Sequence, residues 1–320
     1  LGIVGGDFAQ NPYRRYAASQ LDRMEWHRTL AELSHTFVVQ DRLSLRTTFY
    51  RHDISRAWNK VNRLGGADLY DVLNGVDAGQ NAVLLATLRG ELDTEDPSGL
   101  VYVGPNARRL YAQGVQTDGR FSLDAGPVLQ TFQFGLRYHE DQIRRHHSER
   151  AYRMSRGRLV TADDEVLLTA DNRGRAGAFA AYLLDEVVLF DKLFITPGLR
   201  FEWIRTRFDD AHVAGGRRVD NETVVLLPGL GLYYQLFDSL GLLAGVYRGF
   251  SPVGPGASPD VRPETATNYE AGLRYTRDQS RAELVGFLND YKNLISSCTF
   301  SQACDPDLVG VGAQFNDGEV

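Results

Sequence analysis

The chain has 320 residues, of which 43% are hydrophobic and 24% charged, and its formal net charge at pH 7 is −6. A net negative charge argues against nucleic acid as the main partner. No apolar run reaches the roughly 18 residues of a membrane-spanning helix, but barrel strands are not excluded, because their apolar residues alternate with polar ones.

In chain order, the pattern predicts about eleven antiparallel strands. The first two cover residues 16–39 and 43–57. In the long segment 58–107, the stretches ADLYDVLNG and NAVLLATLRGE are typical of short helices. Further pairs are expected at 108–120 with 127–150 and at 173–190 with 193–209. Two hairpins then lie between residues 223 and 295, and an eleventh strand begins within 310–320.

Alternation with a period of two is clearest in TNYEAGLRY, residues 267–275. Tyr269, Leu273 and Tyr275 share one face, whereas Asn268 and Arg274 share the other. Aromatic residues at both ends of an apolar face, with polar residues opposite, fit a strand that meets lipid on one side and water on the other.

The connections between these strands alternate between short and long. The short ones are 40–42, 124–126, 191–192, 238–239 and 278–280, and the long ones are 58–107, 151–172, 210–222, 252–264 and 297–309. Outer-membrane barrels have this rhythm, because their periplasmic turns are short and their external loops long. Backbone groups in hydrocarbon must be bonded within the protein, so a spanning sheet must close. We therefore predict an all-β fold, an antiparallel transmembrane β-barrel of which this chain is a fragment, with short helices in a long extracellular loop.

Several segments carry a resemblance to a known family. They include NPYRRYAASQLDRM at 11–24, RRLYAQGVQTDGRF at 108–121, YRGFSPVGPG at 247–256 and VRPETATNYEAGLRY at 261–275. Together they resemble the barrel of TonB-dependent outer-membrane receptors, and the first narrows the resemblance to the ferric dicitrate type.

The resemblance implies a 22-stranded barrel whose lumen is filled by an N-terminal plug. Residues 1–320 are then a partial barrel domain, with plug, signal peptide and C-terminal strands expected outside this chain. The implied function is active uptake of an iron(III) chelate, ferric citrate or another siderophore, across the outer membrane of a Gram-negative bacterium. The implied partners are the ferric chelate, outer-membrane lipid, and TonB through the missing N-terminal region; no cofactor is implied.

Two other functions stay open at this point. A passive channel or porin shares the barrel but needs neither plug nor energy coupling. A soluble or surface-exposed β protein used for adhesion would have no reason to alternate its connection lengths.

No set of residues indicates catalysis or a metal site. Ser251 in GFSPVG lacks the glycine spacing of a nucleophile elbow. His139, His146 and His147 have no metal-ligand spacing, and the adjacent pair should point to opposite faces of a strand. The acidic stretch 163–165 is best interpreted as a solvated loop.

Ligand contacts are better sought among arginines that face inward near the extracellular mouth. Ferric citrate is anionic, and guanidinium binds carboxylates through paired hydrogen bonds. For each candidate the simpler alternative is a salt bridge in the polar lumen wall. The candidates, chosen by position along the strands, are Arg51, Arg56, Arg109, Arg137, Arg145, Arg248 and Asn268.

Cys298 and Cys304 lie six apart in the polar segment SSCTFSQACDPD. A metal site would need more ligands nearby. We expect a small disulfide loop in an oxidising compartment.

Overall fold

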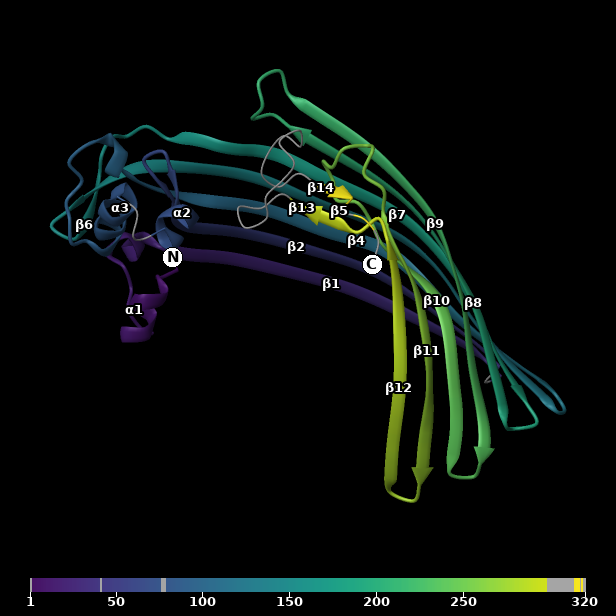
Figure 1. The fold of residues 1–320 in the computed structure, drawn as a ribbon. Coiled ribbons are helices and arrows are strands. Elements are labelled where there is room, and N and C mark those ends of the chain that lie inside the picture. Colours follow the sequence, from purple (N-terminus) through teal and green to yellow (C-terminus); the bar gives the residue numbers. More distant parts are fainter. Residues whose placement is uncertain (1, 41, 76–78, 298–313, 317, 319–320) are drawn as a thin grey trace.

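The computed structural model describes residues 2–40, 42–75, 79–297, 314–316 and 318. Its main feature is a curved antiparallel sheet in which each long strand pairs with the next long strand along the chain (Figure 1). The all-β, antiparallel fold class is confirmed. The long strands are β1 (Arg23–Val39), β2 (Leu43–Leu64), β4 (Val101–Ala125), β5 (Val128–Ser155), β7 (Leu167–Leu189), β8 (Leu193–Asp210), β9 (Arg217–Phe237), β10 (Leu240–Ser251), β11 (Glu264–Arg277) and β12 (Ser280–Lys292).

Shorter elements lie between and beyond these strands. β3 (Ala67–Asp68) pairs with β2, β6 (Arg158–Thr161) pairs with β5, and β13 (Ile295–Ser297) pairs with β14 (Gln314–Asn316) in a separate small sheet. The helices are α1 (Gly5–Gln10), α2 (Leu69–Asn74) and α3 (Gly79–Arg89), and the 3-10 helices are η1 (Ala17–Leu21) and η2 (Pro97–Gly99). Both helices expected within 58–107 are therefore present.

The first and the last of the expected strands have other bounds in the structure. The strand expected to begin at residue 16 begins at Arg23, because residues 17–21 form η1, in which the Ser19 hydroxyl donates to the Tyr16 carbonyl. Of the strand expected within 310–320, the described part is β14. Cys298 and Cys304 lie outside the described residues, so their disulfide stays a prediction.

The short connections gather at one end of the sheet, which we call the turn end. They cover residues 40–42, 126–127, 190–192, 238–239 and 278–279. Left-handed backbone at Gly126 (φ 73°) and Asp278 (φ 51°) produces the tight reversal. The opposite end, the loop end, carries the longer connections 65–100, 156–166, 211–216 and 252–263. The predicted alternation of connection lengths is thus found.

The strands are longer than the sequence pattern indicates. β5 has 28 residues, whereas a tilted strand needs only about 9–11 to cross a bilayer. At about 3.3 Å per residue it extends for roughly 90 Å. Residues 58–64 and 101–107, expected to be loop, continue β2 and β4. Outside a bilayer both faces of a strand meet water, so alternation fades although the backbone pairing continues.

One face of the sheet presents an unbroken apolar row, and we call it the lipid face. The row is formed by registered residues of seven successive long strands, Leu33, Phe49, Val115, Tyr138, Phe179, Trp203 and Val224. Exposure alternates residue by residue along β9, where the lipid-face positions are the exposed ones. The opposite side, which contains Tyr50 and Arg137, we call the lumen face.

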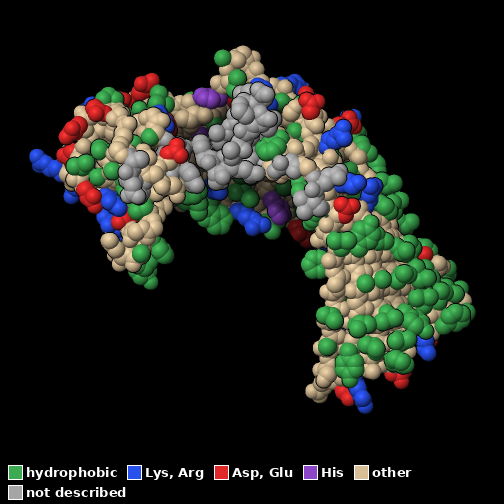
Figure 2. Space-filling view, in the orientation of Figure 1, with side chains coloured by type: hydrophobic (Ala, Val, Ile, Leu, Met, Phe, Trp, Pro, Cys, Tyr) green, Lys and Arg blue, Asp and Glu red, His purple; other side chains and the backbone are tan. Residues whose placement is uncertain are grey.

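The next row of the lipid face towards the loop end is polar. It contains Arg51, Gln113, Glu140, Arg205 and Glu222, again in register. Trp and Tyr concentrate at membrane interfaces, and charge is costly in hydrocarbon. The edge of the hydrocarbon layer therefore falls between these two rows. Figure 2 shows the same division: hydrophobic side chains crowd the turn-end half of β10–β12, and charged side chains gather at the loop end.

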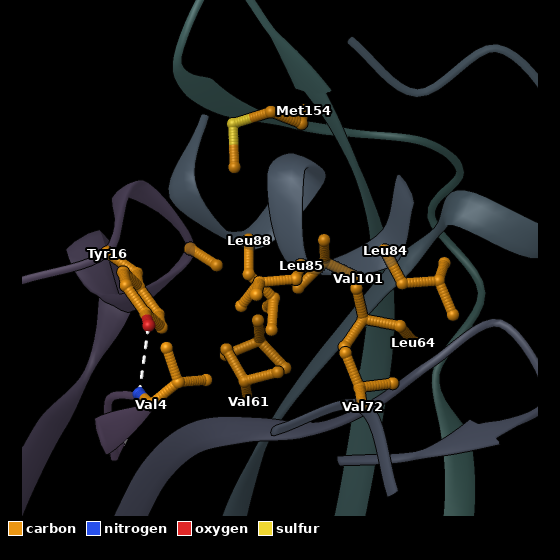
Figure 3. Packing of buried hydrophobic residues seen from close by; sticks show 12 residues of the cluster. Val4, Tyr16, Val61, Leu64, Val72, Leu84, Leu85, Leu88, Val101 and Met154 are labelled. Carbon is orange, nitrogen blue, oxygen red and sulfur yellow. Dashed lines mark hydrogen bonds between the residues drawn. The ribbon is translucent and has the colours of Figure 1, made fainter. Parts of the chain in front are cut away.

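The loop end of β2, β4 and β5 carries a small packed cap. Its core contains the fully buried Leu64, Leu88 and Val101, with Val4 and Tyr16 brought in by the N-terminal segment (Figure 3). The Tyr16 hydroxyl accepts from the Val4 amide at 3.0 Å and donates to the carboxylate of Asp7 at 2.6 Å. Asp7 of α1 also pairs with Arg89 of α3 at 2.8 Å, which ties the N-terminal segment to the cap. No helix of the described chain is long and apolar enough to cross a membrane.

Candidate ligand-binding site

Three arginines from adjacent strands form a row on the lumen face near the loop end. Arg56 of β2 lies opposite Arg108 of β4, and Arg108 lies opposite Arg145 of β5. Each is six residues beyond the registered row of Tyr50, Gly114 and His139 and therefore shares its face. Because adjacent strands lie about 4.8 Å apart, the row places three positive charges side by side.

The positive charges of this row are not neutralised by neighbouring carboxylates in the described part of the chain. The Nε atoms of Arg56 and Arg108 are buried and have no hydrogen-bond partner in the described structure. Arg145 donates from Nη1 to the amide oxygen of Asn172 at 3.3 Å. In the described ranges, no carboxylate lies within ion-pair distance of these three guanidiniums. Like charges directly opposite one another on a sheet destabilise it, so the row favours occupation by an anion.

Two further basic groups lie beside the row. Lys60 is on the lumen face of β2, with Nζ 5.2 Å from the centre of the Trp58 ring. His147 is on β5, two residues beyond Arg145, and its Nε2 is buried without a hydrogen-bond partner in the described structure. Both lie closer to the loop end than the polar row of the lipid face, so they are outside the hydrocarbon layer.

Burial and mutual repulsion together lower the pKa of two members of this cluster. Burial lowers the pKa of Arg108, and the charges of Arg145 and Arg56 lower it further. Burial, followed by the charges of Arg108, Arg145, Lys60 and Arg56, lowers the pKa of His147 to about 4. His147 is therefore neutral at pH 7, whereas the arginines keep their charge because a guanidinium is not deprotonated in proteins.

A second cluster lies nearer the membrane on the same face. The Tyr50 side chain crosses β4 above Gly114, and its hydroxyl lies 2.6 Å from Nδ1 of His139. Arg137 donates to the same hydroxyl from Nη2 at 3.0 Å and from Nε at 3.2 Å. Arg137 thus faces the lumen, where its guanidinium is already engaged with the barrel wall.

Three of the predicted arginines lie on the lipid face instead of facing inward. Arg51 pairs with Asp53 at 2.7 Å, in the polar row just beyond the apolar one. Arg109 is the neighbour of Arg108 and points to the other face. Arg248 lies opposite Thr267, two residues from the lipid-face Val246. Their expected inward orientation is wrong, because parity reverses with every residue along a strand.

The remaining predicted residues do face the lumen. Arg56, Arg137 and Arg145 are described above, and Asn268 of β11 donates its amide to the Tyr247 carbonyl at 3.4 Å. The register brings Arg56 and Arg145 together but keeps Asn268 several strands away. Sequence reasoning missed Arg108, which lies between them. The doublet Arg108-Arg109 signals one arginine on each face, and only the register shows which one joins the row.

The other chemical candidates form no site. His146 and His147 lie on opposite faces, as expected for neighbours in a strand, and His146 contacts Asp171 on the lipid face at 3.6 Å. Ser251 ends β10 opposite Glu264. No group of three metal-binding side chains occurs among the described residues.

Comparison with known proteins identifies the family. The model of the TonB dependent receptor-like β-barrel matches residues 3–318. The chain belongs to this family. Its members are receptors for transport and not enzymes, and their barrels lie in the outer membrane of Gram-negative bacteria.

Solved structures agree in fold. The unliganded ferric citrate transporter FecA is 21% identical with a TM-score of 0.66, and the match covers 91% of this chain and 38% of FecA. The siderophore receptor PiuA from Acinetobacter baumannii is 13% identical with a TM-score of 0.67, covering 93% and 43%. The copper transporter OprC is 14% identical with a TM-score of 0.61, covering 93% and 42%. The chain therefore spans less than half of each of these proteins, and identities this low establish the fold only.

Proposed function

We propose that this chain is part of the barrel of a receptor that imports an anionic ferric chelate of the citrate type through the outer membrane, powered through TonB. The observation that supports this proposal is the row of Arg56, Arg108 and Arg145 on the lumen face. It lies on the external side of the hydrocarbon layer, where a chelate arriving from outside first meets the barrel interior.

The chemistry of the row favours carboxylates. Each guanidinium can bind a carboxylate through two parallel hydrogen bonds, and three of them at strand spacing cover about 10 Å. A complex with several carboxylate groups can contact all three together. The unpaired Nε atoms of Arg56 and Arg108 are donors that such a ligand would satisfy.

Iron as the bound metal is supported by the sequence resemblance, and the negative charge of the ligand is supported by the arginine row. The sequence resembles the ferric dicitrate type, and FecA is among the similar structures. OprC has the same fold and is a copper transporter, so the fold alone is compatible with other metals. A charged row of this kind nevertheless favours anionic complexes over neutral or cationic ones.

The test is binding of ferric citrate to the intact receptor by isothermal titration calorimetry. R108A and the double variant R56A/R108A should both bind ferric citrate more weakly than the unmodified receptor. We expect the affinity to fall by about tenfold or more for every arginine removed, because a charge-assisted hydrogen bond contributes about 1.5–3 kcal/mol. R51A is the matched control, because Arg51 lies on the lipid face and pairs with Asp53. Equal affinities for R108A and the unmodified receptor would contradict the assignment of the row.

Energy coupling needs a separate measurement. Uptake of radiolabelled ferric citrate by cells carrying the intact receptor should stop when TonB is deleted. Uptake that continues at the same rate without TonB would contradict active transport and favour a passive channel.

A further inference from the structure

An acidic side chain on the lipid face of β7 lies within the hydrocarbon layer. Asp185 is six residues from Phe179 along this strand and shares its face, and Phe179 belongs to the apolar row nearest the external edge of the hydrocarbon. Six residues cover about 20 Å, or roughly 14 Å along the membrane normal at a tilt of about 45°. The apolar band of a membrane barrel is about 25 Å tall, so Asp185 lies near its middle.

The residues around Asp185 agree with this depth. Towards the turn end, Val187 and Leu189 continue the lipid face of β7. Towards the loop end, Leu183 is 52% exposed on the same face, and Phe132 of β5 lies directly opposite Asp185. The carboxylate is therefore enclosed by apolar residues on both sides along its strand. An ionisable group in such surroundings is costly and marks a functional contact.

The described chain satisfies only one of the two oxygens of this carboxylate. Oδ2 of Asp185 accepts a hydrogen bond from the side-chain amide of Gln130 on β5 at 3.3 Å. Oδ1 is buried and has no hydrogen-bond partner among the described residues. No basic side chain in this part of the chain forms an ion pair with Asp185. The amide of Gln130 carries a second N–H group, for which the described strands supply no acceptor.

The position of β7 leaves this patch on the outside of the barrel. The edges of the sheet are β1 and β12, and β7 lies in its interior (Figure 1). Closure of the barrel at those edges leaves the lipid face of β7 uncovered. Lipid tails offer neither donors nor acceptors, so the partner that completes this polar pair is a protein.

The pair of Asp185 and Gln130 complements itself, because it places an acceptor beside a donor. Two copies with the same orientation in a membrane are related by a two-fold axis along the membrane normal, and such an axis joins identical patches at the same height. Asp185 and Gln130 are hydrogen-bonded to each other and therefore lie at nearly the same height. The axis then brings the donor of each copy to the acceptor of the other.

We infer that this part of the lipid face binds a second copy of the receptor. The Gln130 amide of each copy donates to the unsatisfied oxygen of Asp185 in the other, and Leu183 packs beside the axis. Rotation about the terminal bond of the carboxylate, which has a broad torsional preference, turns that oxygen towards the partner. The interface lies apart from the arginine row, so the inference does not depend on which chelate is transported.

Sedimentation equilibrium of the intact receptor in density-matched detergent micelles measures the dimer directly. The unmodified receptor should sediment as a dimer that dissociates on dilution. D185L removes both reciprocal hydrogen bonds and should weaken the dimer by about tenfold or more. The barrel itself should stay folded in this variant, because leucine continues the apolar band. The matched control is E186L, which removes the neighbouring carboxylate on the lumen face, opposite Thr131. It should dimerise like the unmodified receptor.

Oxidative cross-linking in native outer membranes locates the interface. L183C should form a covalent dimer, whereas L288C, on the lipid face of β12 and five strands away, should not. The unmodified receptor gives the background from Cys298 and Cys304.

Three results would each overturn part of the inference. A monomeric unmodified receptor would overturn the second copy as the partner and leave Asp185 against lipid. Equal dimer affinities for D185L and E186L would overturn the role of Asp185. Equal cross-linking at residues 183 and 288 would overturn the location, because random collisions would then explain the dimers.

Discussion

Arg108 and Arg109 are neighbours in the chain, and the face to which each points decides its chemistry. Arg108 joins Arg56 and Arg145 on the lumen face, whereas Arg109 lies between Ser55 and Arg144 on the lipid face. Backbone pairing with β2 and β5 imposes both orientations. At the scale of the residue, a shift of register by one position would exchange the faces to which Arg108 and Arg109 point.

His147 provides a prediction at this scale. Burial and the surrounding Arg108, Arg145, Lys60 and Arg56 lower its pKa from 6.5 to about 4. An anion bound to the arginine row offsets the repulsion and raises this pKa, so binding takes up a proton. Affinity for ferric citrate should therefore increase as the pH falls from the bound-state pKa towards 4.

The measurement compares the unmodified receptor with H147N between pH 7.5 and 5. Protonation of the chelate itself affects both proteins equally, so the quantity of interest is their ratio of affinities. The ratio should shift in favour of the unmodified receptor at lower pH. A ratio that stays constant would show that His147 is not coupled to the ligand.

At the scale of the element, β4 depends on a close approach at Gly114. A Cβ atom there would lie 2.4 Å from the Tyr138 carbonyl oxygen and 2.5 Å from the Tyr50 hydroxyl oxygen. The missing side chain leaves the space through which Tyr50 reaches His139 and Arg137. Three strands are thereby joined by one side chain.

G114V should therefore destabilise the barrel by about 1–3 kcal/mol, the usual cost of overpacking. The measurement is urea unfolding of the intact receptor in lipid vesicles. G177V is the control, because a Cβ atom at Gly177 of β7 meets nothing within 4 Å. Similar unfolding midpoints for the two variants would show that Tyr50 can move aside without cost.

At the scale of the whole molecule, the division between lipid and water follows the registered rows. The apolar row runs through Phe49, Tyr138 and Trp203, and the charged row follows one step beyond it. Strands such as β5 continue well past that edge into the external medium, where the cap of α1, α2 and α3 packs on them. The row of Arg56, Arg108 and Arg145 lies in this external part.

A charge placed on the lipid face below the edge tests the arrangement. Leu136 is 56% exposed on that face, between Phe134 and Tyr138. Leu136 lies about 5 Å below the Tyr138 row along the membrane normal, so L136R should cost about 1–2 kcal/mol, between the values for the interface and for the midplane, measured by the same vesicle unfolding. L184R, which makes the same substitution on the lumen face of β7 opposite Gln133 and Gly198, should cost much less. Equal costs would mean that the two faces have been assigned incorrectly.

The sequence by itself determined the class of fold, the positions of the short turns and the face of each well-patterned strand. Alternation in segments such as residues 267–275 is strong because one face meets hydrocarbon and the other meets water. The helices within 58–107 could also be predicted, because their apolar residues do not alternate.

Only the tertiary structure decided the site. Arg56, Arg108 and Arg145 are far apart in sequence, and cross-strand register alone aligns them. Outside the bilayer both faces of a strand are wet, so no hydrophobic pattern indicates the parity of Arg51 or Arg109. Bulges in the pairing at Val61/Arg63 and at His147/Ser148 shift that parity further along β2 and β5.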